Sequence, residues 1–325
     1  MSETAVVVPR RRRRPKFDPL LFEYLLACAF AVALLFAGQA FESFMTFSDG
    51  AIYLAAYDQL KGEAIDEAYI IFTLGTGSSE PISFLVYYLF AQVVDLSTAN
   101  WILNVALFMT LSRFLQSRGV DRRAWGPFVI TNFYILLLGF GVLRLKIAVI
   151  LLVWSWMAKT QQQRWSLRIA SVLAHLQMSL PLAVSMIYDL SEKRSRLGHI
   201  RYVIGLVAVL GVVFAGAIQE KLNFYLQQDF GFPFKMLGIF VASLFLLDRR
   251  RMALVIFGVF FPMALAVGDT RLNIIYVMLI LGEYLTNSRR TQLRTAVLLL
   301  AGAYLSLKGL DFARSLIEGY NFFED

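Results

Sequence analysis

The residues able to do chemistry in this 325-residue chain are a few charged and polar side chains set between long apolar stretches. Arg144 and Arg271 each adjoin such a stretch, where a guanidinium is costly and usually has an anionic partner. The guanidinium is a planar fork of N–H donors that suits a diphosphate, so the two arginines predict a site for that anion. Structural ion pairs, of Arg271 with Asp269 and of Arg144 with Glu80 or Asp49, are the alternative.

His175 lies in an apolar stretch with basic residues at both ends, Arg168 and Lys193. The middle of the stretch contains Pro181, and proline breaks or kinks a helix. We therefore expect two half-length helices that meet near His175 and form a hairpin with the histidine at its tip. Broken helices are tolerated in a membrane where they line protein or a watery cavity. One kinked helix with a packed histidine is the alternative.

Short-range patterns place the other candidates. Asp49, Tyr53 and Tyr57 recur every four residues, which puts them on one face of a helix lying at the outer surface. Glu80 directly precedes Pro81, a sequence suited to a helix start. The remaining candidates adjoin the two arginines: Lys146 follows Arg144 by two residues, and Asp269 and Tyr276 flank Arg271.

The elements that must position these residues are membrane helices. The chain is 58% hydrophobic and 17% charged, whereas a soluble domain has about 45–50% apolar and about 25% charged residues. Residues 20–40 form a run of about 20 residues, the length that crosses a bilayer. We predict an all-α polytopic membrane protein of about 9–11 membrane helices, including broken or re-entrant segments. Residues 1–19 form a basic cytoplasmic segment, 20–307 a single transmembrane domain and 308–325 a short external tail.

The net charge of +8 does not indicate a nucleic-acid partner. The basic residues stand in clusters between apolar runs, where Lys and Arg mark the cytoplasmic side of a membrane. If every cluster is cytoplasmic, Glu80, Arg144, His175 and Arg271 all face outward. The clusters lie at residues 10–14, 113–123, 159–168, 193–201, 249–251 and 289–294.

This topology predicts crossings at residues 81–94, 101–112, 125–140, 145–158, 202–217, 233–247, 252–267, 272–285 and 295–307. Between the basic clusters at 10–14 and 113–123 the chain must cross the membrane an even number of times, but the runs at 20–40, 81–94 and 101–112 give three crossings. We therefore expect residues 69–79 to dip into the membrane and residues 95–100 to form an external loop.

Other kinds of site are not indicated by the sequence. It contains no nucleotide-binding glycine loop. The chain has two histidines, and His199 falls in a cytoplasmic loop, so we expect no metal and no cofactor.

Five short motifs in order resemble the EpsG/Wzy-type bacterial polysaccharide polymerases over about residues 45–280. The chain has Arg144-Leu where family members commonly have Arg-Gln, and a longer spacing from His175 to Ser179 than their His-x-Ser. The motifs are Asp49…Tyr53…Tyr57, Ser79-Glu80-Pro81 with Phe84, Leu143-Arg144-Leu-Lys146-Ile-Ala148, Ala174-His175 followed by Ser179-Leu180, and Arg271…Tyr276.

The resemblance implies a GT-C-like helical bundle in the bacterial inner membrane, with a cytoplasmic N-terminus. The implied enzyme is a glycosyltransferase that polymerises undecaprenyl-diphosphate-linked oligosaccharide repeat units into exopolysaccharide or O-antigen at the outer face. Membrane lipids, a flippase and chain-length regulator proteins are the implied partners.

In that reaction Arg144 and Arg271, with Lys146, would stabilise the leaving diphosphate. His175 or Glu80 would act as general base, and Glu80 could instead orient the acceptor. Asp49 would bind sugar hydroxyls. The other expected substrate-binding residues are Tyr53, Tyr57, Asp269 and Tyr276.

Three alternatives have different consequences. A flippase or transporter of the same lipid-linked sugars would use the buried charges as a pathway, although we find no paired repeat of broken helices in the sequence. An O-antigen ligase would share the arginine and histidine chemistry and differ in its acceptor, and an O-acyltransferase would need the histidine more than the arginines. A non-enzymatic assembly subunit is the remaining alternative.

Overall fold

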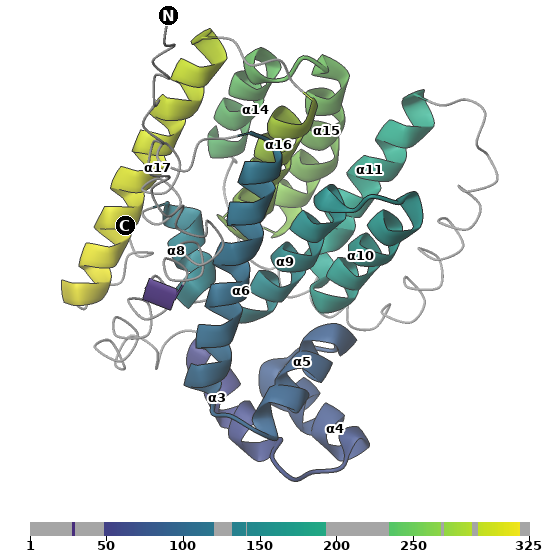
Figure 1. Cartoon of the computed structure of the whole chain (residues 1–325), viewed down its shortest axis with the longest axis vertical. Coiled ribbons are helices and arrows are strands. Elements are labelled where there is room, and N and C mark those ends of the chain that lie inside the picture. Colours follow the sequence, from purple (N-terminus) through teal and green to yellow (C-terminus); the bar gives the residue numbers. More distant parts are fainter. Residues whose placement is uncertain are drawn as a thin grey trace, which may run out of the picture.

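The computed structural model describes residues 28–29, 49–119, 132–140, 142–192, 234–267, 270–287 and 292–318. Every regular element within these residues is a helix, which confirms the predicted all-α class. The helices (Figure 1) are α3 (Asp49–Gln59), α4 (Ile65–Thr76), α5 (Pro81–Ala91), α6 (Leu96–Ser117), α8 (Phe133–Phe140), α9 (Leu143–Met157), α10 (Gln161–Ala174), the 3-10 helix η1 (Leu176–Met178), α11 (Ser179–Glu192), α14 (Phe234–Leu246), α15 (Arg250–Val267), α16 (Thr270–Asn287) and α17 (Gln292–Glu318).

Several helix ends follow from local sequence. The side chains of Asp95 and Thr160 cap α6 and α10, each accepting a hydrogen bond from a backbone N–H three residues on. Pro81 is the first residue of α5, where a proline needs no N–H partner. Gly77 ends α4 with a φ of 60°, a left-handed conformation that glycine adopts without strain.

The long helix α6 connects the two ends of the described structure (Figure 1). Its 22 residues span about 33 Å. At its first end α3, α4 and α5 gather, and the Gln92 side chain donates to the Leu60 carbonyl at 2.9 Å. At its other end Arg118 donates to the carbonyl of Trp156, near the end of α9, at 2.8 Å. Helix α9 packs along α6 and α10, while α11 packs against α15 and α8 against α17.

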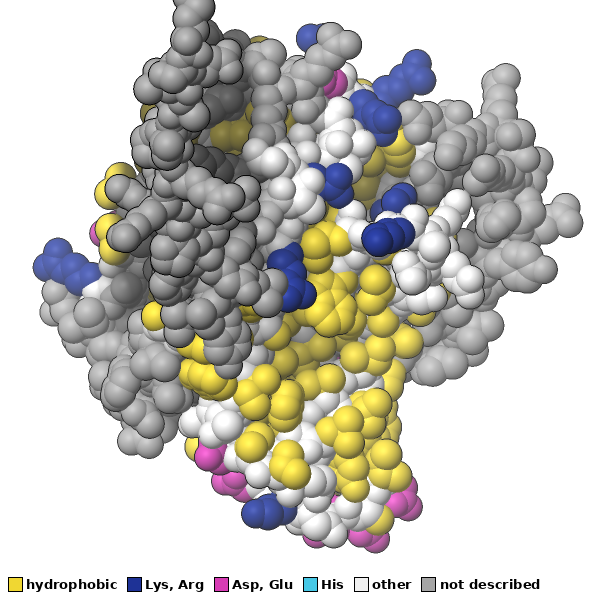
Figure 2. All heavy atoms as spheres, in the orientation of Figure 1, with side chains coloured by type: hydrophobic (Ala, Val, Ile, Leu, Met, Phe, Trp, Pro, Cys, Tyr) yellow, Lys and Arg dark blue, Asp and Glu magenta, His cyan; other side chains and the backbone are white. Residues whose placement is uncertain are grey.

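Charge is distributed unevenly along this axis (Figure 2). The tip formed by α3, α4 and α5 exposes acidic side chains, among them Glu63, Asp66 and Glu67. Farther up, the same face shows a broad area of apolar side chains. Within the tip, α4 and α5 also expose apolar side chains, among them Leu74 and Leu89. Lys and Arg side chains gather farther up the same face. An apolar zone therefore separates an acidic end from a more basic one.

Most predicted apolar runs that fall in the described residues are helices, with two corrections. Helix α6 begins at Leu96, so the predicted external loop at residues 95–100 is wrong: Asp95 caps the helix, and residues 96–100 are its first turns. The last helix continues to Glu318, eleven residues beyond the predicted end at 307. Outside the described residues lie the runs at 20–40 (apart from residues 28 and 29) and 202–217, as well as residues 125–131.

The predicted break at His175 is confirmed, but proline does not cause it. His175 has extended backbone angles (φ −157°, ψ 119°) between α10 and η1. Pro181 is the third residue of α11, in the first turn, where proline is tolerated. A second sharp change of direction, of 118°, separates Phe133–Gly139 from Leu143–Met157, at the turn predicted before Arg144.

Within the described residues, no single helix has both the length and the apolar character needed to cross a bilayer. The bent pair Phe133–Gly139 and Leu143–Met157 meets these criteria when its two helices are taken together.

Candidate active site around Glu80

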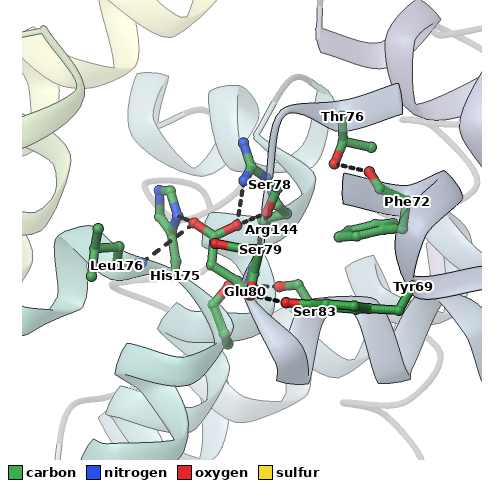
Figure 3. A network of polar contacts seen from close by, with 11 residues as sticks. Tyr69, Phe72, Thr76, Ser78, Ser79, Glu80, Ser83, Arg144, His175 and Leu176 are labelled. Carbon is green, nitrogen blue, oxygen red and sulfur yellow. Dashed lines mark hydrogen bonds and ion pairs between the residues drawn. The ribbon is translucent and has the colours of Figure 1, made fainter. Parts of the chain in front are cut away.

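Glu80 is the centre of a buried polar cluster built from three separate parts of the chain (Figure 3). It occupies the N-cap position of α5 but does not cap that helix with its side chain. The carboxylate points instead toward Arg144 and His175. Its Oε2 accepts hydrogen bonds from Arg144 Nη1 and from the Ser78 hydroxyl. A buried carboxylate is tolerated when it is paired and hydrogen-bonded in this way.

Arg144 enters the cluster from the start of α9, of which it is the second residue. Besides its ion pair with Glu80, the guanidinium lies over the ring of Tyr53, 5.5 Å from the centroid. Its side chain is 13% exposed. The ion pair of Arg144 with Glu80, which the sequence analysis gave as the structural alternative to a diphosphate site, is therefore present. A cation–π contact holds the arginine from a second side.

His175 contributes the third member of the cluster. Its Nδ1 lies 3.1 Å from Glu80 Oε1, and the same oxygen accepts the backbone N–H of Leu176 at 3.5 Å. An ionised carboxylate can only accept, so Nδ1 carries the hydrogen and Nε2 is left as the basic nitrogen. The glutamate thus selects the tautomer of the histidine.

Two serine hydroxyls hold the backbone that carries His175. Ser83 donates to the carbonyl of Ala174, the residue before the histidine, at 2.6 Å. Ser171 donates to the carbonyl of Ala148 at 2.7 Å and so ties α10 to α9. Because Ser83 is in α5 and Ala148 in α9, the end of α10 is fixed to both helices that supply the other two members.

Tyr53, which lies under Arg144, belongs to a group of three tyrosines. The ring of Tyr53 lies 5.9 Å from that of Tyr87, and Tyr57 meets Tyr87 edge-on at 6.2 Å. Burial, with Asp95 and Asp58 nearby, raises the pKa of Tyr57 to about 12. Tyr57 therefore stays protonated at neutral pH, and its hydroxyl donates to the Val94 carbonyl at 2.9 Å. Of the three tyrosines, Tyr57 therefore has a positioning role, because its hydrogen bond joins α3 to the chain that follows α5.

Tyr87 and Ser78 were missed by the sequence analysis. Tyr87 is fully buried in α5, and within the described residues its hydroxyl has no hydrogen-bond partner. Its apolar neighbours in the sequence give no sign of a polar role. Ser78 stands two residues before Glu80, and its proximity to that carboxylate was a signal available in the sequence.

Lys146 does not join the Glu80 cluster. Residues two apart on a helix face different directions, and the Lys146 ammonium points from α9 toward α6 and α8. It donates to the side-chain oxygens of Asn100 and Asn104 (2.5 Å for Asn104) and to the carbonyl of Gly139 at 3.2 Å. The lysine is completely buried. These contacts place Lys146 at the bend between α8 and α9, apart from the Glu80 cluster.

The remaining predicted residues are not brought into the cluster by any described contact. Tyr276 is fully buried in α16 against Phe260, with ring centroids 5.5 Å apart. Asp269 lies outside the described residues. The side chains of Asp49 and Arg271, in the first turns of α3 and α16, also lie outside what the structure describes.

Two hollows of the described surface lie away from Glu80. One has a volume of about 680 Å³ and adjoins the turn between α14 and α15; the other, about 900 Å³, adjoins the turn between α9 and α10. Within the described residues, no group of three His, Cys, Asp or Glu side chains is placed to hold a metal ion.

The cluster combines a fixed cation, an oriented imidazole and a carboxylate that holds both. A guanidinium has five N–H groups, so Arg144 can bond to Glu80 and to an anionic oxygen at the same time. An imidazole whose Nδ1 is bonded to a carboxylate can accept a proton at Nε2. This arrangement suits displacement of an anionic leaving group by a hydroxyl nucleophile.

No protein-family model matches this sequence, and comparison with the curated proteins and with the solved structures likewise gave no match.

Proposed function

We propose that this chain is a multi-pass membrane glycosyltransferase that joins undecaprenyl-diphosphate-linked oligosaccharide repeat units into a polysaccharide. The reaction would take place at the outer face of the bacterial inner membrane, in a GT-C-like helical bundle. The proposal joins the EpsG/Wzy-like motifs of the sequence to one structural observation: Glu80 contacts Arg144 and His175 through different oxygens of one carboxylate.

The proposed step is a substitution at an anomeric carbon. The hydroxyl of the acceptor repeat unit attacks this carbon, and a new C–O bond forms as the bond to the lipid diphosphate breaks. The diphosphate leaves with the electron pair, and its growing negative charge is stabilised by Arg144, together with Arg271 by the sequence argument. The hydroxyl proton passes to Nε2 of His175.

The contacts of Glu80 favour His175 as the base. Both oxygens of Glu80 already accept hydrogen bonds, from Arg144 and Ser78 on one side and from His175 and Leu176 on the other. A carboxylate bound in this way holds its neighbours in position, as the carboxylate does in hydrolytic triads. We therefore assign Glu80 to orientation and His175 to proton transfer.

The depth of the cluster is consistent with a lipid-linked substrate. Helix α5 runs from Glu80 toward the acidic tip over 11 residues, or about 16 Å. Lys146, two residues from Arg144, contacts α6 at Asn100 and Asn104, in the part of that helix near the tip. If the acidic tip is external, as the positive-inside rule suggests, the cluster lies below the outer surface, within reach of a diphosphate at the lipid headgroups.

A test in cells separates the polymerase from its alternatives. Strains would carry Arg144→Ala or, as a matched control, Arg113→Ala, which removes an exposed arginine of α6. We expect Arg144→Ala to abolish polymer while single repeat units still accumulate or reach the surface and the protein stays in the membrane. The control should make normal polymer.

Other outcomes contradict the proposal. Complete loss of surface repeat units, with none accumulating outside, would indicate a flippase. Polymer of normal length with impaired transfer to its final acceptor would indicate a ligase. Normal polymer from Arg144→Ala would remove the arginine from the reaction.

A further inference from the structure

The hollow of about 680 Å³ between the ends of α11 and α14 and the start of α15 is unrelated to the Glu80 cluster. Its lining includes three consecutive arginines, Arg249, Arg250 and Arg251, and the single acidic residue Asp248. The lining therefore has an excess of positive charge. A volume of this order is typical of cavities that hold small molecules.

The placement of the arginines is unfavourable to the helix they begin. Arg250 and Arg251 are the first two residues of α15, an 18-residue helix. The N-terminus of a helix carries partial positive charge, so cations there oppose the helix dipole. Within the described residues, neither arginine forms an ion pair. An anion held between the arginines and the start of α15 would relieve both unfavourable features.

The remaining lining residues are apolar or aromatic. Phe245 is 68% exposed at the hollow, and Leu244 lies beside it. Tyr188, from α11, lies under the guanidinium of Arg249 at 5.7 Å. A free phosphate would use the arginines and leave Phe245 in water. A ligand with a phosphate and a hydrocarbon chain would use both parts of the lining.

From these features we propose that this hollow binds the phosphodiester headgroup of an anionic membrane phospholipid. The phosphate would lie between Arg250 and Arg251 and the start of α15, and the acyl chains would pass over Phe245. The inference rests on the membrane location in the proposed function, in which the arginine cluster at 249–251 faces the cytoplasm. Basic pockets between helices on that side of membranes bind anionic headgroups.

The test uses the full-length protein, purified in a neutral detergent. Dioleoylphosphatidylglycerol, dioleoylphosphatidylcholine and inorganic phosphate would be titrated separately, with the Tm and native mass spectrometry as readouts. We expect the anionic lipid to raise the Tm and to bind in a defined stoichiometry, while the zwitterionic lipid and phosphate produce little change.

The variant Arg250→Ala/Arg251→Ala should bind the anionic lipid about 30-fold more weakly, from an effect of about five- to sixfold per arginine. Arg113→Ala/Arg164→Ala removes two exposed arginines from the same end of the molecule and should bind like the unmodified protein. If the alanine variant does not purify as a single species, Arg250→Gln/Arg251→Gln replaces it.

Equal affinity for the two lipids, or full binding by the variant at Arg250 and Arg251, would overturn the proposal. A response to phosphate alone equal to that of the anionic lipid would show a free-phosphate site and overturn the lipid assignment. The titration uses no glycan substrate, so its result does not depend on polymerase activity. A failed lipid titration would contradict the headgroup site alone, and a failed polymerase assay would contradict the proposed function.

Discussion

Glu80 Oε1 and His175 Nδ1 lie 3.1 Å apart although the two residues are separated by 95 positions in the chain. This contact joins the start of α5 to the break between α10 and η1. It also fixes which ring nitrogen of His175 can take a proton. Because Arg144 bonds to the other oxygen of the same carboxylate, one side chain orients the proposed base and the proposed cation together.

Removal of the Glu80 charge should impair the reaction more than the removal of a similar charge elsewhere. Glu80→Gln leaves Arg144 without its counterion and no longer selects the tautomer of His175. We expect at least a tenfold loss of polymerisation rate, since loss of the carboxylate that orients a catalytic histidine costs more than this in hydrolytic triads. Membrane fractions would be assayed at matched protein levels.

The control for that substitution is Glu67→Gln, at an exposed position of α4. It should keep the full rate. Glu80→Asp retains the charge but retracts the carboxylate, and we expect a rate between those of Glu80→Gln and the unmodified protein. A rate for Glu80→Gln that equals that of Glu67→Gln would show that the carboxylate does not take part.

His175→Ala removes the proposed base. Proton transfer by a positioned side chain is worth about 10²- to 10⁴-fold in rate, so we expect kcat to fall by that factor with little change in KM. Full activity of His175→Ala would exclude the histidine and return the base role to Glu80. A higher KM with an unchanged kcat would indicate that His175 binds the acceptor instead.

Lys146 provides a test of structural against substrate-binding roles. Lys146→Met leaves the amide oxygen of buried Asn104 without this donor, and an unpaired buried group costs about 1–3 kcal/mol. The half-buried Asn100 loses the same donor. We expect a lower Tm and weaker polymerisation. The triple variant Lys146→Met/Asn100→Leu/Asn104→Leu removes both the donor and its side-chain acceptors, and should recover much of the Tm and activity.

A triple variant that recovers its Tm but remains inactive would contradict the structural role. The ammonium would then contribute directly to the reaction, as the sequence alone suggested.

Ser83→Ala should change the position of His175 without touching the substrate. The variant loses the hydrogen bond to the Ala174 carbonyl, a contribution of about 1 kcal/mol to stability. We expect a lower kcat and an unchanged KM. Ser83→Thr, which keeps the hydroxyl, should restore part of the rate, whereas a purely structural role would lower the Tm and leave kcat per folded molecule unchanged.

Asp95 predicts an acid-sensitive helix end. Hydrogen bonds, chiefly from the backbone N–H of Thr98, lower the pKa of its carboxyl below the ordinary value of 3.8. A lowered folded-state pKa means that the contribution to stability is complete above about pH 4 and is lost as the pH falls through the folded-state pKa. We expect Asp95→Ala to cost about 1 kcal/mol at pH 7 and less near pH 2.

Unfolding in detergent at the two pH values would measure this difference. Asp95→Asn can still cap α6 but cannot titrate, so its stability should depend less on acid than that of the unmodified protein. An equal cost of Asp95→Ala at both pH values would contradict the capping role of the ionised carboxylate.

Much of the helix pattern could be predicted from the sequence because apolar runs, caps and breaks are local. The grouping of Glu80, Arg144 and His175 was also within reach, since the positions of basic clusters assigned all three to one side. The hydrogen bonds that hold the backbone at His175 were not, since no local pattern pairs Ser83 with Ala174.

The separation of Lys146 from the Glu80 cluster could have been predicted from the spacing of residues on a helix. Its spacing of two from Arg144 directs the two side chains of one helix apart. Asn100 and Asn104, four apart on an apolar helix, form one face that could receive a buried cation. By contrast, Tyr87 has a buried hydroxyl with no hydrogen-bond partner in the part of the chain that the structure describes. This burial depends on how α3 and α5 pack, and the sequence has no signal for it.

The most direct test of the central claim uses purified protein and a defined undecaprenyl-diphosphate-linked repeat unit, with the products separated by size on a gel. The unmodified protein should produce a ladder of polymers, and Arg144→Ala and His175→Ala should leave the repeat unit unjoined while folding normally. A ladder of equal length and yield from both variants would contradict the claim that the Glu80, Arg144 and His175 cluster is a glycosyltransferase site.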